Sequence, residues 1–160
     1  LDHPWHRAER GELPVSSLPE LVAPLAEAAG IPLRGDEFEL ILGGEFLARP
    51  TIVERVVRLR EEGYSLALLT NSFKEYREFL ESRIDVSIFD HIIDSSEVGC
   101  RKPEPAIYEL TARRLGARPD QILYLDDFAG NVDGAIAAGW DAFLVTSEEQ
   151  ALAELERRLG

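Results

Sequence analysis

The stretch that decides the fold begins with Gly-Cys-Arg-Lys-Pro-Glu-Pro-Ala-Ile-Tyr at residues 99–108. After a helical segment it continues with the apolar run Gln-Ile-Leu-Tyr-Leu at residues 121–125 and then with Asp126-Asp127. A buried strand that ends in polar residues is typical of a parallel α/β sheet, in which function gathers in the loops after the strands. A lysine fixed beside two prolines and a pair of carboxylates at a strand end together indicate a site for phosphate and a divalent cation.

Helices and apolar strands alternate on both sides of this stretch. Strands are predicted at 64–70, 91–93, 121–125 and 142–145, and helices at 50–63, 73–82, 104–115, 132–138 and 148–159. This order predicts an α/β fold with a three-layer, doubly wound parallel sheet. Residues 1–16 give no clear period, and two helices capped by Ser17 and Asp36 are expected between Leu18 and Leu47. We therefore divide the chain into a small helical layer, 1–48, and an α/β core, 49–160.

The composition restricts the class of partner and the compartment. Thirty acidic and 17 basic residues give a formal net charge of −13, which argues against nucleic acid or an anionic membrane as the main partner. The single cysteine, Cys100, excludes an internal disulfide and fits a reducing cytoplasm. No apolar stretch approaches the roughly 18 residues of a membrane span. A soluble, cytoplasmic protein is expected.

Asp126 and Asp127 enter a turn, so at least one carboxylate projects from the sheet edge. Adjacent carboxylates repel unless a cation or protons intervene, and oxygen ligands suit magnesium. Asn131, four residues beyond Asp127, is expected to orient that carboxylate from one helical turn away. The alternative is an aspartate that caps the next helix; Lys102 in the same constellation favours the metal site.

Lys102 is restricted by Pro103, because proline confines the preceding residue to extended backbone. A positioned ammonium suits phosphate oxygens, whereas the ordinary fate of a lysine is the exposed surface. Thr70 and Asn71 end a buried strand just before a helix, where hydroxyl, amide and backbone N–H groups can bind an anion. An ordinary helix cap by Asn71 or Ser72 is equally compatible with that tripeptide.

Three further residues are interpreted as having no catalytic or metal-binding role. His3 and His6 are three residues apart and could share a metal on a helix, but no helix is predicted there, so polar terminal residues are favoured. Cys100 next to Arg101 could have a depressed pKa, yet no pattern supports a nucleophile, and it is interpreted as structural.

Taken together, residues 68–72, 99–108 and 123–131 resemble the second, third and fourth motifs of the haloacid dehalogenase (HAD) superfamily. The resemblance is to its phosphatases with a small helical cap, such as the N-terminal domain of soluble epoxide hydrolases. It covers residues 50–146 closely, and residues 5–47 look like the cap. It implies that Thr70 binds a phosphoryl oxygen, that Asn71 lines the site and that Lys102 neutralises charge. It also implies Mg²⁺ on Asp127, with Asp126 adjacent and Asn131 in support, and a small phosphorylated substrate.

The sequence departs from this family in its first motif, an apolar strand ending in Asp-x-Asp that carries the nucleophile. No Asp-x-Asp occurs in the chain, which contains no methionine and begins at Leu1. In the family, the missing strand lies between the strands that end here at Thr70 and Asp126. We expect either an upstream segment in that slot, two sheet halves that close against each other, or a second copy of the chain that completes the sheet.

The leading function is metal-dependent hydrolysis of phosphoesters, through an aspartyl-phosphate if the first strand exists upstream. Without that strand, a metal-activated water held by Asp126, Asp127 and a histidine is the remaining enzymatic route. A different class also competes, a non-catalytic module that self-associates as a homodimer. Dehalogenase activity is less favoured, because phosphatases dominate the group that these motifs resemble.

Overall fold

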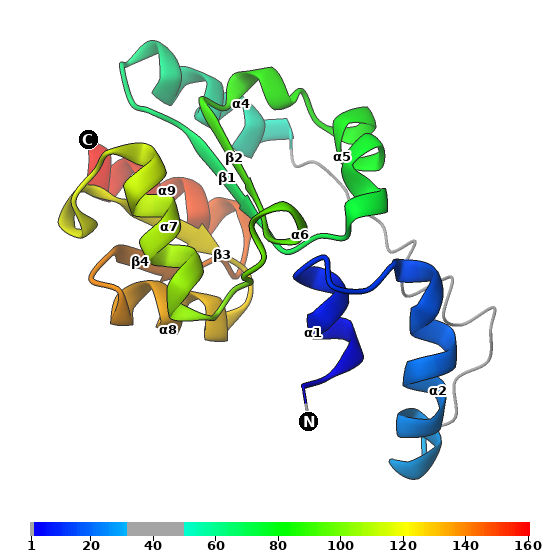
Figure 1. Ribbon diagram of the computed structural model, residues 1–160. Coiled ribbons are helices and arrows are strands. Elements are labelled where there is room, and N and C mark those ends of the chain that lie inside the picture. The colour runs from blue at the N-terminus through cyan, green and yellow to red at the C-terminus, as the bar shows by residue number, and fades with distance from the viewer. Residues whose placement is uncertain (1, 32–49) are drawn as a thin grey trace.

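The computed structural model describes residues 2–31 and 50–160. Four short strands alternate with helices: β1 (Ala67–Thr70), β2 (His91–Asp94), β3 (Leu123–Asp126) and β4 (Asp141–Leu144) (Figure 1). β1 pairs with β2 in parallel, with Ala67 opposite His91, and β3 pairs with β4 in parallel, with Leu123 opposite Asp141. The α/β class predicted from the sequence is confirmed.

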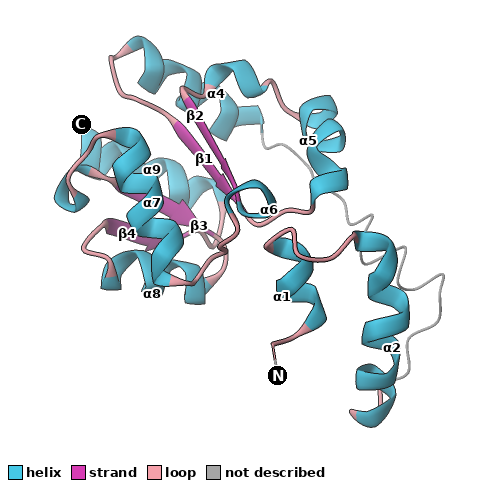
Figure 2. Ribbon diagram, viewed as in Figure 1, coloured by secondary structure: helices cyan, strands magenta, loops and turns pink. Residues whose placement is uncertain are grey.

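Helices make up most of the rest of the described chain (Figure 2). They are α1 (Pro4–Glu9), α2 (Leu18–Ala28), α4 (Pro50–Glu61), α5 (Arg77–Arg83), α6 (Ser95–Val98), α7 (Pro105–Leu115), α8 (Ala129–Ala137) and α9 (Glu148–Leu159). Short 3₁₀ turns lie at Val15–Ser17, Lys74–Tyr76, Val86–Ile88 and Pro119–Gln121. None of the helices in the described ranges is both long and apolar enough to cross a bilayer.

Strands β3 and β4 are covered by helices on both faces, and each face has its own apolar core. On one face, α7 and α8 pack through a cluster that includes Ile93, Tyr108, Tyr124, Ala135 and Trp140. On the other face, α4 and α9 pack through Leu59, Phe143, Ala151 and Leu155. Strand β3 serves both cores, with Tyr124 in the first and its neighbours Leu123 and Leu125 in the second, as the two-residue period of a strand requires.

The four strands form two separate two-stranded sheets and not one continuous sheet. Within the described residues, β1 and β3 do not pair, so the two halves have not closed into a single ladder. Side chains hold the halves together instead. Ala67 and Leu69 of the first pair and Tyr124 of the second belong to one core, while Leu66 packs in the other core with Leu125.

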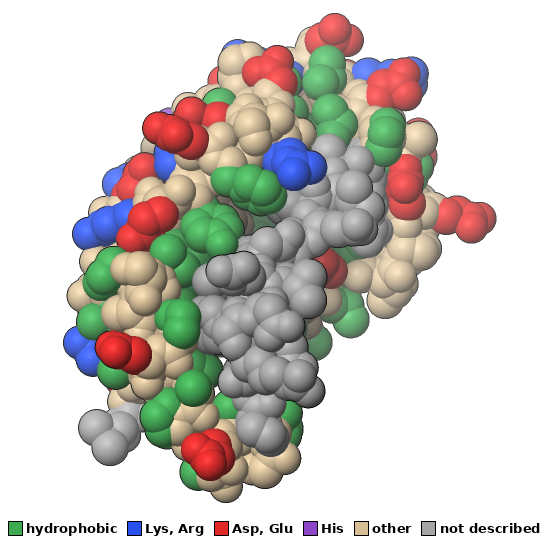
Figure 3. Space-filling model, turned by 90° about the vertical axis from the view of Figure 1, so that its right-hand side faces the viewer, with side chains coloured by type: hydrophobic (Ala, Val, Ile, Leu, Met, Phe, Trp, Pro, Cys, Tyr) green, Lys and Arg blue, Asp and Glu red, His purple; other side chains and the backbone are tan. Residues whose placement is uncertain are grey.

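The N-terminal segment has a small core of its own, formed by Ala8 and Leu18 with Phe73 from beyond β1. Helix α1 in this segment was not expected, because a six-residue helix is too short to show a period. Ser17 takes the N-cap position of α2, but its hydroxyl donates to the carbonyl of Pro14 (2.7 Å) and makes no capping bond. The helix expected after Asp36 lies outside the described residues. Figure 3, which shows the right-hand side of Figure 1, has hydrophobic side chains on its surface. Leu25 of α2 is 46% exposed.

Candidate functional site

The loops after β2 and β3 meet in a buried ion pair. The Nζ of Lys102 donates to Oδ2 of Asp126 at 2.7 Å, and the two side chains are only 10% and 7% exposed. The same ammonium lies 5.8 Å from the ring centroid of Tyr124, within the range of a cation–π contact. A charge buried this deeply keeps one position, because leaving its partner would be costly. Lys102 is therefore fixed at the carboxyl end of β3.

Asp126 is the acceptor around which this site is organised. Besides the bond from Lys102, its carboxylate accepts hydrogen bonds from the hydroxyl of Tyr124 and from the backbone N–H of Phe128 (2.8 Å). Both of its oxygens also accept from the side-chain amide of Asn131 (3.0 and 3.1 Å). Burial alone would raise the pKa of Asp126, but the charge of Lys102 and these hydrogen bonds lower it below its ordinary value of 3.8. Asn131 is itself held by Tyr108, whose hydroxyl donates to its carbonyl at 2.8 Å.

Asn71 fixes the backbone of Lys102. Its Oδ1 accepts the Lys102 N–H at 2.8 Å, and its Nδ2 donates to the Lys102 carbonyl at 3.0 Å. Because both ends of the amide are used, Asn71 does not cap the following helix, where Phe73 occupies the N-cap position. Thr70 ends β1 and is paired in register with Asp94. Its hydroxyl makes a long contact of 3.4 Å with the carbonyl of Asn71.

The two adjacent aspartates differ in their surroundings. Asp127 is exposed and makes no hydrogen bond or ion pair with another described residue, whereas Asp126 is saturated by protein donors. Asn131 was expected to orient Asp127; in the structure its amide donates to Asp126. The expectation failed because the turn after β3 directs the first carboxylate, not the second, back over the start of α8.

A magnesium ion requires oxygen ligands beyond those that these residues supply. No group of three His, Cys, Asp or Glu side chains within residues 2–31 and 50–160 is placed to hold a metal. Mg²⁺ is commonly held by one or two carboxylates together with waters and phosphate oxygens. Asp127, accessible and unpaired among the described residues, fits one such position, while Asp126 is engaged by Lys102.

Five residues at or beside the site were not identified from the sequence. Tyr124 could have been, because it lies two residues before Asp126 on a strand and therefore on the same face. Arg101 and Glu104, which flank Lys102-Pro103, pair with Glu9 and with Arg10 of the N-terminal segment. No local pattern indicates these pairs, because the partners are more than 90 residues apart in the chain.

The histidines and the cysteine remain outside this site's hydrogen bonds. His3 is the N-cap of α1 and accepts the N–H of Trp5 at 3.2 Å. Burial, and then the charge of Arg101, lowers the pKa of His6. Burial raises the pKa of Cys100, which disfavours a thiolate nucleophile and agrees with its structural interpretation.

Comparison with known proteins places this site in a family. A family model described as haloacid dehalogenase-like hydrolase matches residues 7–139. The chain is 30% identical to the mouse (Mus musculus) protein "Bifunctional epoxide hydrolase 2" over 77% of its length, and covers 23% of that protein. It is 32% identical, over 68% of its length, to "Glyceraldehyde 3-phosphate phosphatase" of Methanothermobacter thermautotrophicus, of which it covers 47%.

A solved HAD family enzyme from Bacteroides thetaiotaomicron, in complex with magnesium and inorganic phosphate, superimposes with a TM-score of 0.68. The identity is 18%, and the match covers 91% of this chain and 77% of the other. This likeness concerns the fold alone. The chain spans less than half the length of the two curated relatives named above. The match of the family model over most of the chain, on strands that converge on Lys102 and Asp126, shows that the chain belongs to the haloacid dehalogenase-like hydrolase family.

Proposed function

We propose that this chain is the phosphatase-type hydrolase part of its protein and acts on a small phosphorylated substrate. The observation that carries the proposal is the buried Lys102 ammonium, fixed by Asp126 and Asn71 at the carboxyl ends of the strands. A positioned cation there is suited to the charge that develops on phosphoryl oxygens in a transition state. The relatives named as phosphatase, and the neighbour solved with magnesium and phosphate, support this assignment.

Each residue of the site has a distinct role in this proposal. Lys102 neutralises phosphoryl charge, and Asp126 holds its ammonium in place without reaching the substrate. Thr70 and Asn71 line the phosphate position. Asn71 also fixes the backbone of Lys102 through its two hydrogen bonds. Asp127 contributes a carboxylate to a Mg²⁺ ion, which when bound supplies further positive charge against the phosphoryl oxygens. Asn131 supports Asp126, and residues 1–48 act as the cap over residues 49–160.

The nucleophile is the open part of the proposal, because these 160 residues contain no Asp-x-Asp. A carboxylate supplied by a strand beside β3 would attack phosphorus, expel the alcohol and leave an aspartyl-phosphate for water to hydrolyse. Attack by water on the substrate itself would form no such intermediate. Acid quenching during turnover of a ³²P-labelled phosphoester separates the two routes, because only the first leaves label on the protein.

The proposal is tested by substitution of Asp127, whose side chain makes no hydrogen bond or ion pair with another described residue. Asp127→Asn is expected to lower hydrolysis of p-nitrophenyl phosphate about 100-fold or more, because one ligand of the ion is lost. Its thermal unfolding should match that of the wild type. Asp133→Asn, which neutralises another exposed aspartate in helix α8, is the matched control and should retain activity. Undiminished turnover in Asp127→Asn, or in excess chelator, would refute the metal-dependent mechanism.

A second candidate function, a module that self-associates as a homodimer, is favoured by two observations. All four residues of β1 are only partly buried, although a strand inside a doubly wound sheet is normally covered on both faces. Each strand also has one edge without a strand partner among the described residues. Such edges can pair with another chain.

A cytoplasmic location stays a prediction from composition.

A further inference from the structure

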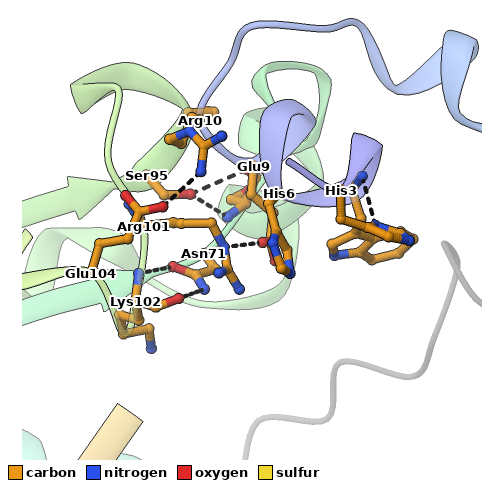
Figure 4. Close-up of polar contacts among 12 residues, drawn as sticks. His3, His6, Glu9, Arg10, Asn71, Ser95, Arg101, Lys102 and Glu104 are labelled. Carbon is orange, nitrogen blue, oxygen red and sulfur yellow. Dashed lines mark hydrogen bonds and ion pairs between the residues drawn. The ribbon is translucent and has the colours of Figure 1, made fainter. Parts of the chain in front are cut away.

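Helix α1 is docked directly onto the loop that carries Lys102 (Figure 4). Glu9 accepts a hydrogen bond from Nε of Arg101, and the two side chains are 11% and 14% exposed. Arg10, the C-cap residue that follows the helix, donates to Oε1 of Glu104 at 2.6 Å. The ion pairs therefore engage the residue immediately before Lys102 and the second residue after it.

A hydrogen bond within the loop connects the residues that make these two ion pairs. The second oxygen of Glu104 accepts the backbone N–H of Arg101 at 3.1 Å, which closes the turn around Lys102-Pro103. Asn71 also holds the backbone of Lys102, through two hydrogen bonds. Lys102 thus has three restraints: α1 acts on its flanks, Asn71 on its backbone and Asp126 on its ammonium.

The position of α1 is fixed by close backbone contacts as well. Gly11 follows the helix with φ +70°, and a Cβ there would come within 2.2 Å of the Ser96 carbonyl oxygen. The ammonium of Lys74 donates to the carbonyl of Gly11 at 2.9 Å. Only glycine permits this approach, so the end of α1 is seated on α6, just before the lysine loop.

Burial distinguishes these ion pairs from ordinary surface pairs. Exposed pairs contribute little to stability, and the pair of Arg7 with Glu12 on the same segment is of that kind, with side chains 43% and 44% exposed. Arg10 and Arg101 are only 12% and 14% exposed. Glu104 is 35% exposed, however, and Arg10 also pairs with Asp2 and Glu12. The pair that is buried on both sides is that of Arg101 with Glu9, which is 11% exposed. Removing the partner of a charge this deeply buried forces the charge to move toward water. For Arg101, that movement would displace the backbone of Lys102.

We propose that Glu9 and Arg10 are positioning residues for Lys102, so that docking of helix α1 sets the placement of the site's ammonium. When α1 lifts away, Arg101 and Glu104 lose their partners and the lysine loop loosens. The N-terminal helical segment thereby controls whether the phosphate site is competent. This inference rests on the proposed function for its consequence in catalysis, but the coupling of α1 to Lys102 is independent of any reaction.

The coupling can be measured without a substrate, because the chain has only two lysines, Lys74 and Lys102. Amine acetylation followed by peptide mass spectrometry gives the labelling rate of each. In the wild type, buried Lys102 should label slowly and exposed Lys74 quickly. In Glu9→Gln and in Arg10→Gln, we expect Lys102 to label about tenfold faster, well below the unfolding temperature, because the loop opens locally. Glu20→Gln and Arg7→Gln, matched in charge change, should leave it slow.

A charge swap distinguishes positioning from simple loss of stability. The double substitution Glu9→Arg with Arg101→Glu restores an ion pair of opposite sense and should return Lys102 to slow labelling. If the single substitutions lower the melting temperature while Lys102 stays protected in the folded protein, the ion pairs are only structural and the inference is overturned.

The catalytic consequence has its own readout. Glu9→Gln should lower kcat/KM for p-nitrophenyl phosphate about 10–100-fold, mainly in kcat, because the ammonium is misplaced in the transition state. Faster labelling without loss of activity would show that α1 positions Lys102 but that Lys102 does not serve hydrolysis. A wild-type protein with no phosphatase activity would refute the proposed function and leave the labelling test intact. Slow labelling in all variants would refute the coupling itself.

Discussion

At the scale of single residues, Asp126 carries more of this site than any other side chain. It accepts hydrogen bonds from Lys102, Tyr124, Phe128 and Asn131, which come from the lysine loop, β3 and the first turn of α8. Burial and then its hydrogen bond to Asp126 raise the pKa of Tyr124, which keeps the phenol protonated as a donor. The site is therefore held in shape by one carboxylate that must remain ionised.

The ionised state of Asp126 should be visible in acid unfolding. Its pKa in the folded protein is lowered, so its contribution is complete above the unfolded pKa of about 3.9 and is lost as pH falls through the folded value. The wild type should lose stability below about pH 4. Asp126→Asn should be about 3 kcal/mol less stable at neutral pH, because Lys102 is left buried without its counter-charge, and should show a shallower acid slope in urea titrations.

Asp120→Asn is the control for this prediction, since Asp120 forms a fully exposed pair with Arg118. Its stability at neutral pH should stay close to that of the wild type. An Asp126→Asn protein with unchanged stability and an unchanged acid slope would show that the buried pair contributes nothing to folding.

Sequence reasoning predicted that Thr70, Lys102 and Asp127 converge at one edge of the sheet, because each follows a predicted parallel strand. In the structure, hydrogen bonds join Lys102 to Asn71 and Asp126, the neighbours of Thr70 and Asp127. It assigned the roles of neighbouring side chains less well. The choice between Asp126 and Asp127 as the partner of Asn131 depends on the direction of a single turn, which residue spacing alone does not determine. The contacts of Glu9 and Arg10 depend on tertiary docking and leave no local signal.

At the scale of elements, the seam between α7 and α8 depends on the close approach of Tyr108 to Gly134. A Cβ at Gly134 would lie 2.7 Å from the Tyr108 hydroxyl oxygen, and Tyr108 is 0% exposed, so the ring would have to shift within the core. Tyr108 also holds Asn131, so the seam links helix packing to the site.

Two glycines of the same helix should respond oppositely to alanine. Gly134→Ala gains about 1 kcal/mol of helix propensity, but forcing the Tyr108 ring to move should cost more, about 1–3 kcal/mol, so net destabilisation is expected. At Gly130 the nearest atom, 3.0 Å away, belongs to the ring of Phe128, which is 62% exposed and can swing outward. Gly130→Ala should be neutral or stabilising by about 0.5–1 kcal/mol. Equal effects in thermal unfolding would refute this account of the seam.

Sequence reasoning predicted best the elements whose own residues show both a periodic apolar face and a capping residue at the end. Helix α9 was predicted at its observed bounds, because Ser147 caps it by accepting the N–H of Gln150 at 3.1 Å and its apolar face is periodic. Helix α1 and the four-residue α6 are too short to show a period. Strand β1 begins at Ala67 and not at Tyr64, because hydrogen bonding with β2, not apolar character, sets where the ladder starts.

At the scale of the whole molecule, the two apolar cores of the α/β region are continuous, whereas the hydrogen-bonded ladder of strands is interrupted. Helices α7 and α8 cover one face of both strand pairs, and α4 and α9 cover the other face of β3–β4, yet among the described residues β1–β2 and β3–β4 are separate sheets. Side-chain packing is non-directional and tolerates such a discontinuity, whereas a strand edge stays competent to pair until another strand covers it. Residues 2–31 and 50–160 therefore combine a packed interior with strand edges that no described strand covers.

These open edges lead us to expect that the 160-residue chain self-associates in solution. Light scattering should show a mass that rises with protein concentration, and amide hydrogens of β1 and β3 should exchange more slowly as it does. Leu68→Lys, which places a charge on the partly buried strand β1, should abolish association, because lysine on an edge strand blocks pairing. Leu25→Lys, on the exposed face of α2, is the control and should leave association intact. If Leu25→Lys abolishes association instead, the interface is the exposed face of α2. If the protein stays monomeric at every concentration and its β1 and β3 amides exchange slowly, these strand edges are already covered within one chain.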